Sequence, residues 1–451
     1  MGETSSRAGR LPPGPKPLPL LGNLLDFIRQ GPDVFENAAR TYGDITTVSF
    51  GARKHFIIND PALIQTILVK DRRNFEKGRA LRLASRVLGS GLLTSDGEVY
   101  QKQRRAAQPA FNIKNMDDFG NSVLHYVTEL NRTWRDGLEF DVSDEMSALC
   151  LNVAAQAFLG VDLAASAHTI VKVFDDAMAG LNQLNLLPPF AEKLPLPLNF
   201  RLKRLKARLG EIVDGIIAQR RASEGRATDL LSLVLANVEE GAFTPEELRE
   251  QVITFLFAGY EAPCRVLTWT WYLLARHPEA EAKLHDEIAA VLGERAPAFE
   301  DWKSLPYTRG VVSESMRLYP PAWIIARRIM SPYEVGGWTL PAGEEIFLSP
   351  YITQRDARFF PNPLAFDPGR WLEPAEGRPQ FAYFPFGGGL RGCAGVHFAW
   401  PEMVLLVAGI AQRWRVVISD NREVKPNPAF TFAPSSPIRA VARSRGAVSW
   451  N

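Results

Sequence analysis

The residues best suited to chemistry in this chain lie in one glycine-rich run near its C-terminus. Residues 386–395 read Phe-Gly-Gly-Gly-Leu-Arg-Gly-Cys-Ala-Gly, with Cys393 just before an expected helix over residues 397–411. Backbone N–H groups at a helix start and a nearby cation such as Arg391 both lower the pKa of a thiol. The glycines let the backbone pass close to a flat ligand. An inert buried cysteine beside a turn is the simpler alternative, but the arrangement favours a thiolate site.

A carboxylate in the middle of a long apolar segment is the second candidate. Residues 252–275 are apolar almost all round a helix, which predicts burial, and they contain Glu261 close to Gly259. A buried carboxylate is costly unless it is paired or used. From the residues alone, a core ion pair and a functional acid are both open for Glu261. Gly259 predicts that another group approaches the helix backbone closely.

Both segments resemble the cytochrome P-450 family. The run around Cys393 matches the family's haem-binding loop, Phe-x-x-Gly-x-Arg-x-Cys-x-Gly, at every fixed position. The stretch Ala258-Gly259-Tyr260-Glu261 resembles the start of the family's Ala-Gly-x-Glu-Thr-Thr helix segment. The resemblance covers the chain from Leu11 to the C-terminus. It implies haem b as the cofactor, with Cys393 as the thiolate ligand of the iron. It also implies a mainly α fold with a small β region, the α+β cytochrome P-450 fold.

The chain departs from the family pattern directly after the glutamate. Ala262 and Pro263 stand where the family has two threonines, so the hydroxyl that helps to deliver protons during oxygen activation in the family is missing. Pro263 also lacks the N–H that would bond the Gly259 carbonyl, which predicts a kink. Three explanations stay open: a relay through water or a substrate hydroxyl, use of peroxide, or a reaction without dioxygen. The predicted catalytic residues are Glu261, Ala262 and Gly259.

The same resemblance implies the remaining site residues. Haem carries two propionates, and buried carboxylates favour arginine partners. The predicted haem-binding residues are Tyr100, Arg104, Arg328, Phe386, Arg391, Cys393 and Gly395. The predicted pocket residues are Leu81, Phe257, Ala258, Ala322, Trp323, Ile324, Phe430 and Phe432. Each apolar side chain can equally belong to the core, and together they indicate an apolar, medium-sized substrate such as a terpenoid, steroid or fatty-acid-like molecule.

A glutamate and an arginine three residues apart form a further match. Glu314 and Arg317 share one helix face. With Arg370 in a Pro-Gly-Arg-Trp segment, they resemble the Glu-x-x-Arg pair of the family and its arginine partner. A solvated surface pair is the alternative from spacing alone. The resemblance assigns all three residues to structure near the haem.

The elements that must position these groups show local signals. Thr244-Pro245-Glu246-Glu247 is a capping box with proline at the first helical position, and it predicts a helix that ends near Arg276. Residues 46–58 predict a hairpin, and residues 333–349 predict further sheet. Because no linker or repeat divides the chain, we expect one haem-thiolate domain over residues 11–451, after a disordered extension over residues 1–10.

Bulk composition limits the classes of partner. Hydrophobic residues make up 46% of the 451 residues, and 52 Lys+Arg against 50 Asp+Glu give a net charge of +2, which indicates neither nucleic acid nor a charged membrane surface. The three scattered cysteines favour a reducing compartment. The apolar stretch over residues 18–28 is broken and too short for a bilayer, which takes roughly 20 residues. We expect a soluble, cytoplasmic, monomeric protein without an integral membrane anchor.

These observations predict a haem-thiolate monooxygenase that inserts one oxygen atom from O2 into an apolar substrate. The sequence encodes neither a flavin nor an iron–sulfur segment, so a separate ferredoxin or flavodoxin with its reductase would supply electrons. Ala262-Pro263 favours an alternative, a peroxide-driven or non-oxygenative haem-thiolate enzyme, and a non-catalytic haem sensor is a third. A dinucleotide-binding loop over residues 387–395 is rejected, because this loop does not follow a strand in a βαβ unit.

Overall fold

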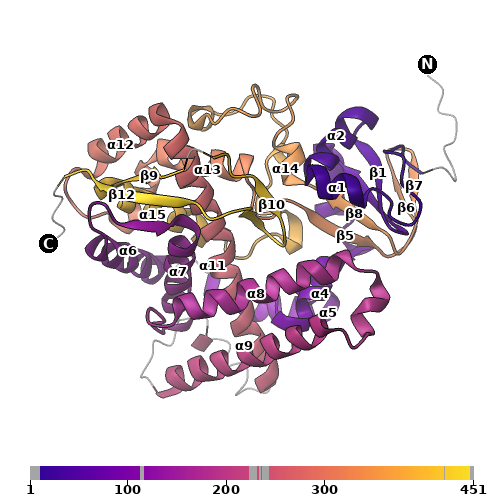
Figure 1. Ribbon diagram of the computed structural model, residues 1–451, viewed down its shortest axis with the longest axis horizontal. Helices are drawn as coiled ribbons and strands as arrows, with labels where there is room; N and C mark the ends of the chain where they lie inside the picture. The colour runs from indigo at the N-terminus through magenta and orange to yellow at the C-terminus, as the bar shows by residue number, and fades with distance from the viewer. Residues whose placement is uncertain are drawn as a thin grey trace.

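The computed structural model describes residues 11–111, 116–222, 231–232, 235, 243–420 and 422–446. Helices dominate and small sheets accompany them, so the expected mainly α architecture with a small β region is confirmed. Figure 1 shows most helices at the left and centre, while β1, β5 and β8 gather near α1 and α2 at the right. The extension predicted for residues 1–10 lies outside the described residues.

The element bounds are as follows. The α-helices are α1 (Leu24–Gln30), α2 (Asp33–Tyr42), α3 (Pro61–Gln65), α4 (Arg79–Leu88), α5 (Gly97–Ala107), α6 (Met116–Thr133), α7 (Val142–Ala154), α8 (Ala167–Leu186), α9 (Pro197–Ala222), α11 (Pro245–Arg276), α12 (Pro278–Leu292), α13 (Pro306–Leu318), α14 (Pro350–Thr353) and α15 (Val396–Arg413). The strands are β1 (Ile45–Phe50), β2 (Arg53–Ile58), β3 (Phe75–Lys77), β4 (Glu139–Asp141), β5 (Ile325–Ile329), β6 (Tyr333–Val335), β7 (Trp338–Leu340), β8 (Glu345–Leu348), β9 (Trp414–Ile418), β10 (Pro426–Pro428), β11 (Phe432–Pro434) and β12 (Arg439–Ser444).

Helix α11 is the central element of the helical part. It packs against α7, α9, α13 and α15, and Figure 1 shows it passing through the middle of the molecule. The predicted capping box is present: the Thr244 hydroxyl accepts from the Glu247 N–H at 3.1 Å, and the Glu247 carboxylate accepts from the Thr244 N–H at 2.7 Å. The helix continues through Pro263 to Arg276, so the proline does not end it. The predicted helix bounds are therefore confirmed.

The largest sheet orders its five strands β1-β2-β8-β5-β3. The hairpin predicted for residues 46–58 is confirmed by the antiparallel pairing of β1 with β2. Strand β5 lies between β8 and β3, where Arg327 pairs with Ile346 on one side and Lys77 on the other. Successive side chains of a strand point to opposite faces, so Arg327 and Arg328 cannot face the same space.

Buried apolar side chains form one large cluster around α11, and smaller clusters lie under the sheet. Among the described residues, no helix, α11 included, is long and apolar enough to cross a bilayer.

Candidate active site

A cavity of about 1270 Å³ connects α11, the loop before α15 and strand β5. Its lining is mainly apolar and includes most of the predicted site residues. The predicted residues that line it are Leu81, Tyr100, Arg104, Phe257, Ala258, Gly259, Glu261, Ala262, Ala322, Trp323, Ile324, Phe386, Arg391, Cys393, Gly395 and Phe430. The fold therefore brings the predicted thiol, the predicted acid and the predicted pocket to one space, although they come from distant parts of the sequence.

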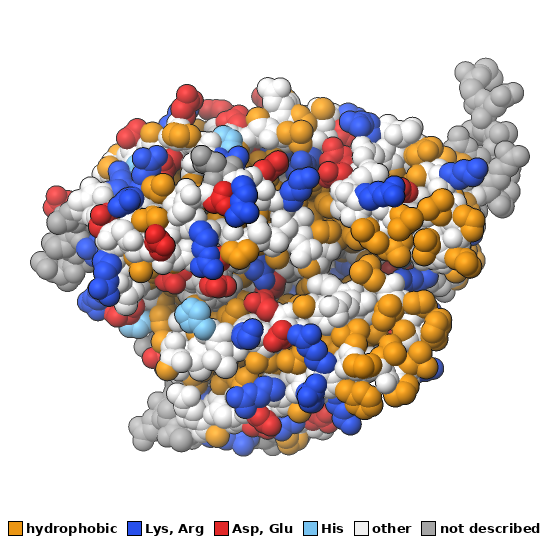
Figure 2. Space-filling view, in the orientation of Figure 1, with side chains coloured by type: hydrophobic (Ala, Val, Ile, Leu, Met, Phe, Trp, Pro, Cys, Tyr) orange, Lys and Arg blue, Asp and Glu red, His pale blue; other side chains and the backbone are white. Residues whose placement is uncertain are grey.

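Exposed apolar side chains lie beside one end of this cavity. Leu20 is 95% exposed, and Leu186 is 52% exposed, and both line the cavity. Ile28 of α1 and Phe190 of the segment after α8 are further exposed apolar residues, close in the sequence to Leu20 and Leu186. Figure 2 shows hydrophobic side chains gathered on the right-hand face of the molecule. An apolar molecule would meet little polar surface on its way into the cavity.

Cys393 lies on the loop that leads into α15. Its N–H donates to the Phe386 carbonyl at 3.0 Å, which closes the loop on itself. Gly389 adopts φ +65°, and a Cβ there would lie 2.3 Å from the Leu68 carbonyl oxygen, so this position requires glycine. Cys393 borders the cavity, and its accessible surface faces this interior space although the residue is surrounded by protein. The loop therefore presents the thiol to the hollow interior.

The charges around this thiol differ from those expected from the sequence. Burial raises the pKa of Cys393, and the Gly395 N–H and the Arg104 guanidinium partly oppose that rise. Arg391 is not the neighbouring cation, because its guanidinium pairs with Asp96 at 2.7 Å and donates to the carbonyls of Arg72 and Phe75. The expected effect of Arg391 on the thiol is thus corrected to one of Arg104, which is distant in sequence.

The cations that border the cavity also correct one assignment. Arg327 is 6% exposed and lines the cavity, whereas Arg328 does not line it and lies 3.3 Å from Glu76. Alternation along β5 turns the two side chains to opposite faces, so Arg327, and not the predicted Arg328, borders the cavity. Burial and the nearby Arg391 lower the pKa of Arg327 to about 10. Among the described residues, no carboxylate forms an ion pair with Arg327 at contact distance, and its guanidinium donates to the adjacent Ala326 carbonyl at 3.0 Å.

Two further polar groups stand on the same side of the cavity. The Tyr100 hydroxyl donates to the Leu390 carbonyl at 2.6 Å, so its proton is already committed. Lys77, which sequence reasoning missed, is 5% exposed and donates to the carbonyls of Leu92 and Ser95. Burial lowers the pKa of Lys77 to about 7. Its ammonium also lies 4.5 Å from the Tyr100 ring centre.

The carboxylate of α11 is held in an ion-pair network. Glu261 accepts from the Arg265 guanidinium at 3.1 Å and from the Thr431 hydroxyl at 2.5 Å. Arg265 also contacts Ser143 at 3.0 Å and Asp175 at 3.3 Å. Burial alone would lower the pKa of Arg265, but the Glu261 carboxylate reverses this and raises it. Burial raises the pKa of Asp175 to about 6, against the opposing effect of Arg265.

The close approach predicted for Gly259 is an approach of helix α7. A Cβ at Gly259 would lie 2.8 Å from the Ala154 Cβ and 3.0 Å from the Phe158 ring. The missing side chain therefore makes room for helix packing, although Gly259 also borders the cavity. Ala262 lines the cavity with a methyl group, and Pro263 has no N–H for the Gly259 carbonyl.

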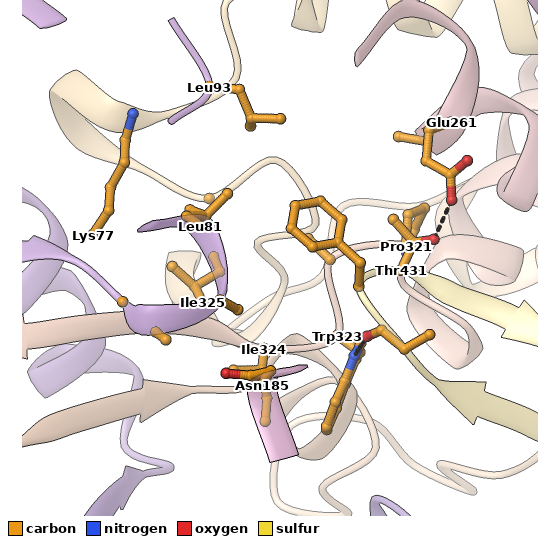
Figure 3. Close-up of a pocket in the computed structure, with 18 of the residues that line it drawn as sticks. Lys77, Leu81, Leu93, Asn185, Glu261, Pro321, Trp323, Ile324, Ile325 and Thr431 are labelled. Carbon is orange, nitrogen blue, oxygen red and sulfur yellow. Dashed lines mark hydrogen bonds between the residues drawn. The ribbon is translucent and has the colours of Figure 1, made fainter. Parts of the chain in front are cut away.

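The apolar wall opposite α11 is formed around Trp323. Its indole N–H donates to the Ala429 carbonyl at 2.9 Å, and Figure 3 shows Trp323 beside Ile324 at the edge of the pocket. Phe432 stacks on Trp323 with ring centres 5.2 Å apart, and it is fully buried outside the cavity lining. The predicted contact of Phe432 with the pocket is corrected, because the adjacent residue Thr431 lines the cavity in its place. Phe430 does line it and packs on Phe257.

The predicted structural residues lie outside the cavity lining. Glu314 and Arg317 are fully buried and bonded to each other, and Arg370 donates to Glu314 at 2.9 Å. The arrangement ties α13 to the segment before the cysteine loop.

Comparison with known proteins places the chain in one family. The family model described as "Cytochrome P450" matches residues 12–439. The chain belongs to the cytochrome P450 family. It is 36% identical over 454 residues to cyclooctatin synthase of Streptomyces melanosporofaciens, covering 98% of each chain. It is 38% identical over 411 residues to cyclooctat-9-en-7-ol 5-monooxygenase of the same organism, covering 89% of this chain and 88% of the relative. Pentalenene oxygenase of Streptomyces avermitilis is 31% identical over 439 residues, covering 96% and 97%.

Membership fixes the cofactor and the type of reaction. Cytochrome P450 enzymes carry thiolate-ligated haem, and so does this P450. The site fits that group, because a thiol and a buried arginine without a carboxylate partner among the described residues border the same cavity. When bound, haem supplies the activation of oxygen, while the protein orients the substrate and excludes water. The enzyme is a monooxygenase that receives electrons from a separate redox partner and acts on hydrophobic substrates.

Proposed function

We propose that this P450 inserts one oxygen atom from O2 into a terpenoid. The observation that carries the proposal is the large, mainly apolar cavity bordered by Cys393. The names of the relatives support the substrate class: pentalenene oxygenase names a terpene, and cyclooctat-9-en-7-ol 5-monooxygenase names an alcohol of a terpenoid skeleton. The apolar surface around Leu20 and Leu186 supports entry of such a molecule.

Cys393 is the proposed axial ligand of the haem iron. The chain has three cysteines, and Cys150 and Cys264 are fully buried and outside the cavity lining. Burial raises the pKa of Cys264 to about 12, which keeps that thiol protonated and inert. Cys393 alone among the three combines access to the cavity with an N–H donor from Gly395.

The propionates are proposed to bind at the basic side of the cavity. Arg104, Arg327 and Arg391 line it there, and Arg327, which pairs with no carboxylate in the described part of the chain, has the charge that a buried propionate needs. Lys77 borders the same side, where its ammonium can donate one more hydrogen bond, whereas the Tyr100 proton is held by the Leu390 carbonyl. Phe386 and Gly395 complete the lining near the thiol.

Glu261 is the proposed acid of the oxygenation reaction. Glu261 lines the cavity, which supports a route for protons through its carboxylate, while Arg265 holds that carboxylate in place and, as a guanidinium that keeps its proton, is not itself a relay. Ala262 leaves this route without the usual neighbouring hydroxyl. Gly259 is proposed to hold α11 in the position that this route requires, because its missing side chain allows α11 to pack closely on α7.

We also propose the redox partner, the oligomeric state and the location of the enzyme. A ferredoxin or flavodoxin with its reductase would supply the electrons to a monomeric enzyme with one domain over residues 11–451. A cytoplasmic location is supported by the three cysteines, all of which are free thiols.

The test is an optical titration of the purified haem protein with terpenes, steroids and fatty acids. A low-spin to high-spin shift with terpenes at micromolar concentration supports the proposal. A shift with only fatty acids or only steroids contradicts the substrate class. Turnover is then compared with reductase and ferredoxin or with peroxide alone. We expect product with the redox partners, and product only with peroxide would contradict O2 as the oxidant.

A further inference from the structure

A hydroxyl–carboxylate pair interrupts the apolar lining beside α11. Thr431, in the turn between β10 and β11, donates to Glu261 Oε1 at 2.5 Å, and both residues line the cavity. Figure 3 shows the pair at one side of the pocket, opposite Lys77. Their neighbours in the lining are apolar: Phe257, Ala262 and Phe430. A ligand beside this part of α11 therefore meets a pair of polar side chains in a mainly apolar wall.

The geometry leaves the threonine oxygen, and not the carboxylate, for a ligand. Both carboxylate oxygens of Glu261 already accept from Arg265, and one also accepts from Thr431. An ionised carboxylate can only accept, so the Thr431 proton is committed to it. In the described part of the chain, Thr431 Oγ1 has no other hydrogen-bond partner. It therefore offers lone pairs to the cavity and no proton.

Two other polar residues of the lining, Lys77 and Asn185, are engaged elsewhere. The Lys77 ammonium donates to the carbonyls of Leu92 and Ser95. The Asn185 carbonyl groups accept from Arg79, and its backbone carbonyl also accepts from Arg53. Figure 3 shows Lys77 and Asn185 well apart from the Glu261–Thr431 pair. The α11 side of the lining also includes Thr254, whose hydroxyl has no hydrogen-bond partner among the described residues, and Gly259, whose carbonyl lacks an N–H from Pro263. Thr431 differs from Thr254 because its own proton is held by Glu261, so that it can only accept.

We propose that Thr431 determines specificity by accepting a hydrogen bond from a hydroxyl group on the substrate. The preferred substrate is then an apolar skeleton that already carries an alcohol, since a ketone, aldehyde or ether has no proton to donate. The inference rests on the proposed terpenoid function and narrows it to a terpenoid alcohol. Such a substrate must come from an earlier hydroxylation, or from a cyclisation in which water adds to the final carbocation and gives the alcohol.

The test measures binding, not turnover, with two matched ligand sets. These are abietadiene, abietadienol and abietadienal, and bornane, borneol and camphor, each titrated into the haem protein and followed by its spin-state shift. In the wild type we expect an alcohol to bind more tightly than its hydrocarbon and its carbonyl form in at least one set. Thr431→Val keeps the shape but removes the hydroxyl, and should reduce the alcohol-over-hydrocarbon preference about tenfold. Thr431→Ser should retain it.

A second variant tests the direction of the hydrogen bond. In Glu261→Gln the side-chain carbonyl can remain on Arg265 while the amide donates to Thr431, which frees the threonine proton for the cavity. The preference should then move from the alcohol toward the aldehyde or ketone. Haem content and the urea midpoint of each variant report whether it folds, and Thr431→Ser serves as the variant closest to the wild type.

The outcomes separate the two proposals. If hydrocarbons bind, but alcohols gain nothing over them or Thr431→Val leaves their preference unchanged, the role of Thr431 is overturned and the terpenoid proposal stands. If no terpenoid of either set or of the wider panel shifts the spectrum, both are overturned. A tenfold loss of affinity in Thr431→Val that is confined to the alcohols supports both proposals.

Discussion

Arg317 and Glu314 form a bidentate ion pair from which water is excluded. Two guanidinium nitrogens of Arg317 lie 2.8 Å from the two carboxylate oxygens of Glu314, and both side chains are 0% exposed. Arg317 also donates to three carbonyls of residues 354–365. Glu314 accepts from Arg370 and from the Trp371 indole. The pair therefore anchors the segment before the cysteine loop to α13.

Removing the charge of Glu314 should destabilise the fold. Glu314→Gln leaves the buried Arg317 without a counter-ion, and we expect the free energy of unfolding to fall by about 3 kcal/mol. Glu300→Gln is a matched control, because Glu300 pairs with Lys303 at the same i, i+3 spacing but on the surface. That change should be below about 0.5 kcal/mol. Urea unfolding measures both, and equal losses would contradict the structural role.

Replacing Cys393 should abolish thiolate ligation. Cys393→Ser removes the sulfur that borders the cavity, so the reduced carbon-monoxide complex should lose the red-shifted Soret band of a thiolate-ligated haem. Cys264→Ala is the control, because Cys264 is fully buried outside the cavity lining. It should keep that band. A normal band in Cys393→Ser would show that another group ligates the iron.

Adjacent arginines of β5 should differ in their effect on haem retention. Arg327→Gln removes a buried charge that lines the cavity, and we expect haem transfer to apomyoglobin to accelerate about tenfold, as for the loss of one charge-assisted hydrogen bond. Arg328→Gln removes only a partly exposed partner of Glu76 and should transfer haem at the wild-type rate. Faster transfer from Arg328→Gln than from Arg327→Gln would reverse the assignment.

A buried histidine should make the fold sensitive to acid. His55 of β2 is 4% exposed, and neither ring nitrogen has a hydrogen-bond partner among the residues that the structure describes. Burial, with the nearby Arg53 and Arg79, lowers its pKa to about 3. Below pH 6.5 His55 binds a proton in the unfolded chain but stays neutral in the folded one. The free energy of unfolding therefore falls as the pH drops from 6.5 toward 3.

His55→Phe should remove this dependence while keeping the ring stack on Phe347. Between pH 7 and pH 4.5 we expect the free energy of unfolding of the wild type to fall by on the order of 3 kcal/mol more than that of the variant. The reason is that pH 4.5 lies about two units below the pKa of an unfolded histidine, and each unit corresponds to about 1.36 kcal/mol. Denaturant curves at both pH values give this difference, in which other titrating groups cancel. Parallel losses would show that Glu345, 3.7 Å away, keeps His55 protonated in the fold.

Local patterns of the sequence were sufficient for the features that depend on neighbours in the chain. The capping box at Thr244 and the end of α11 at Arg276 follow from backbone chemistry within a few residues. The Cys393 loop carries its ligand, its glycines and its following helix in one run. Glu314 and Arg317 meet because a helix brings residues three apart to one face.

Tertiary structure decided to which side of an element each side chain points and which residues far apart in the sequence come into contact. A strand exchanges faces at every residue, so the sequence alone could not choose Arg327 over Arg328, nor Thr431 over Phe432. The cation beside Cys393 is Arg104, which folding brings from α5. Thr431 reaches Glu261 across 170 residues. Such contacts leave no periodic or local signal, because they arise only when the packed elements fix which side chains share one cavity.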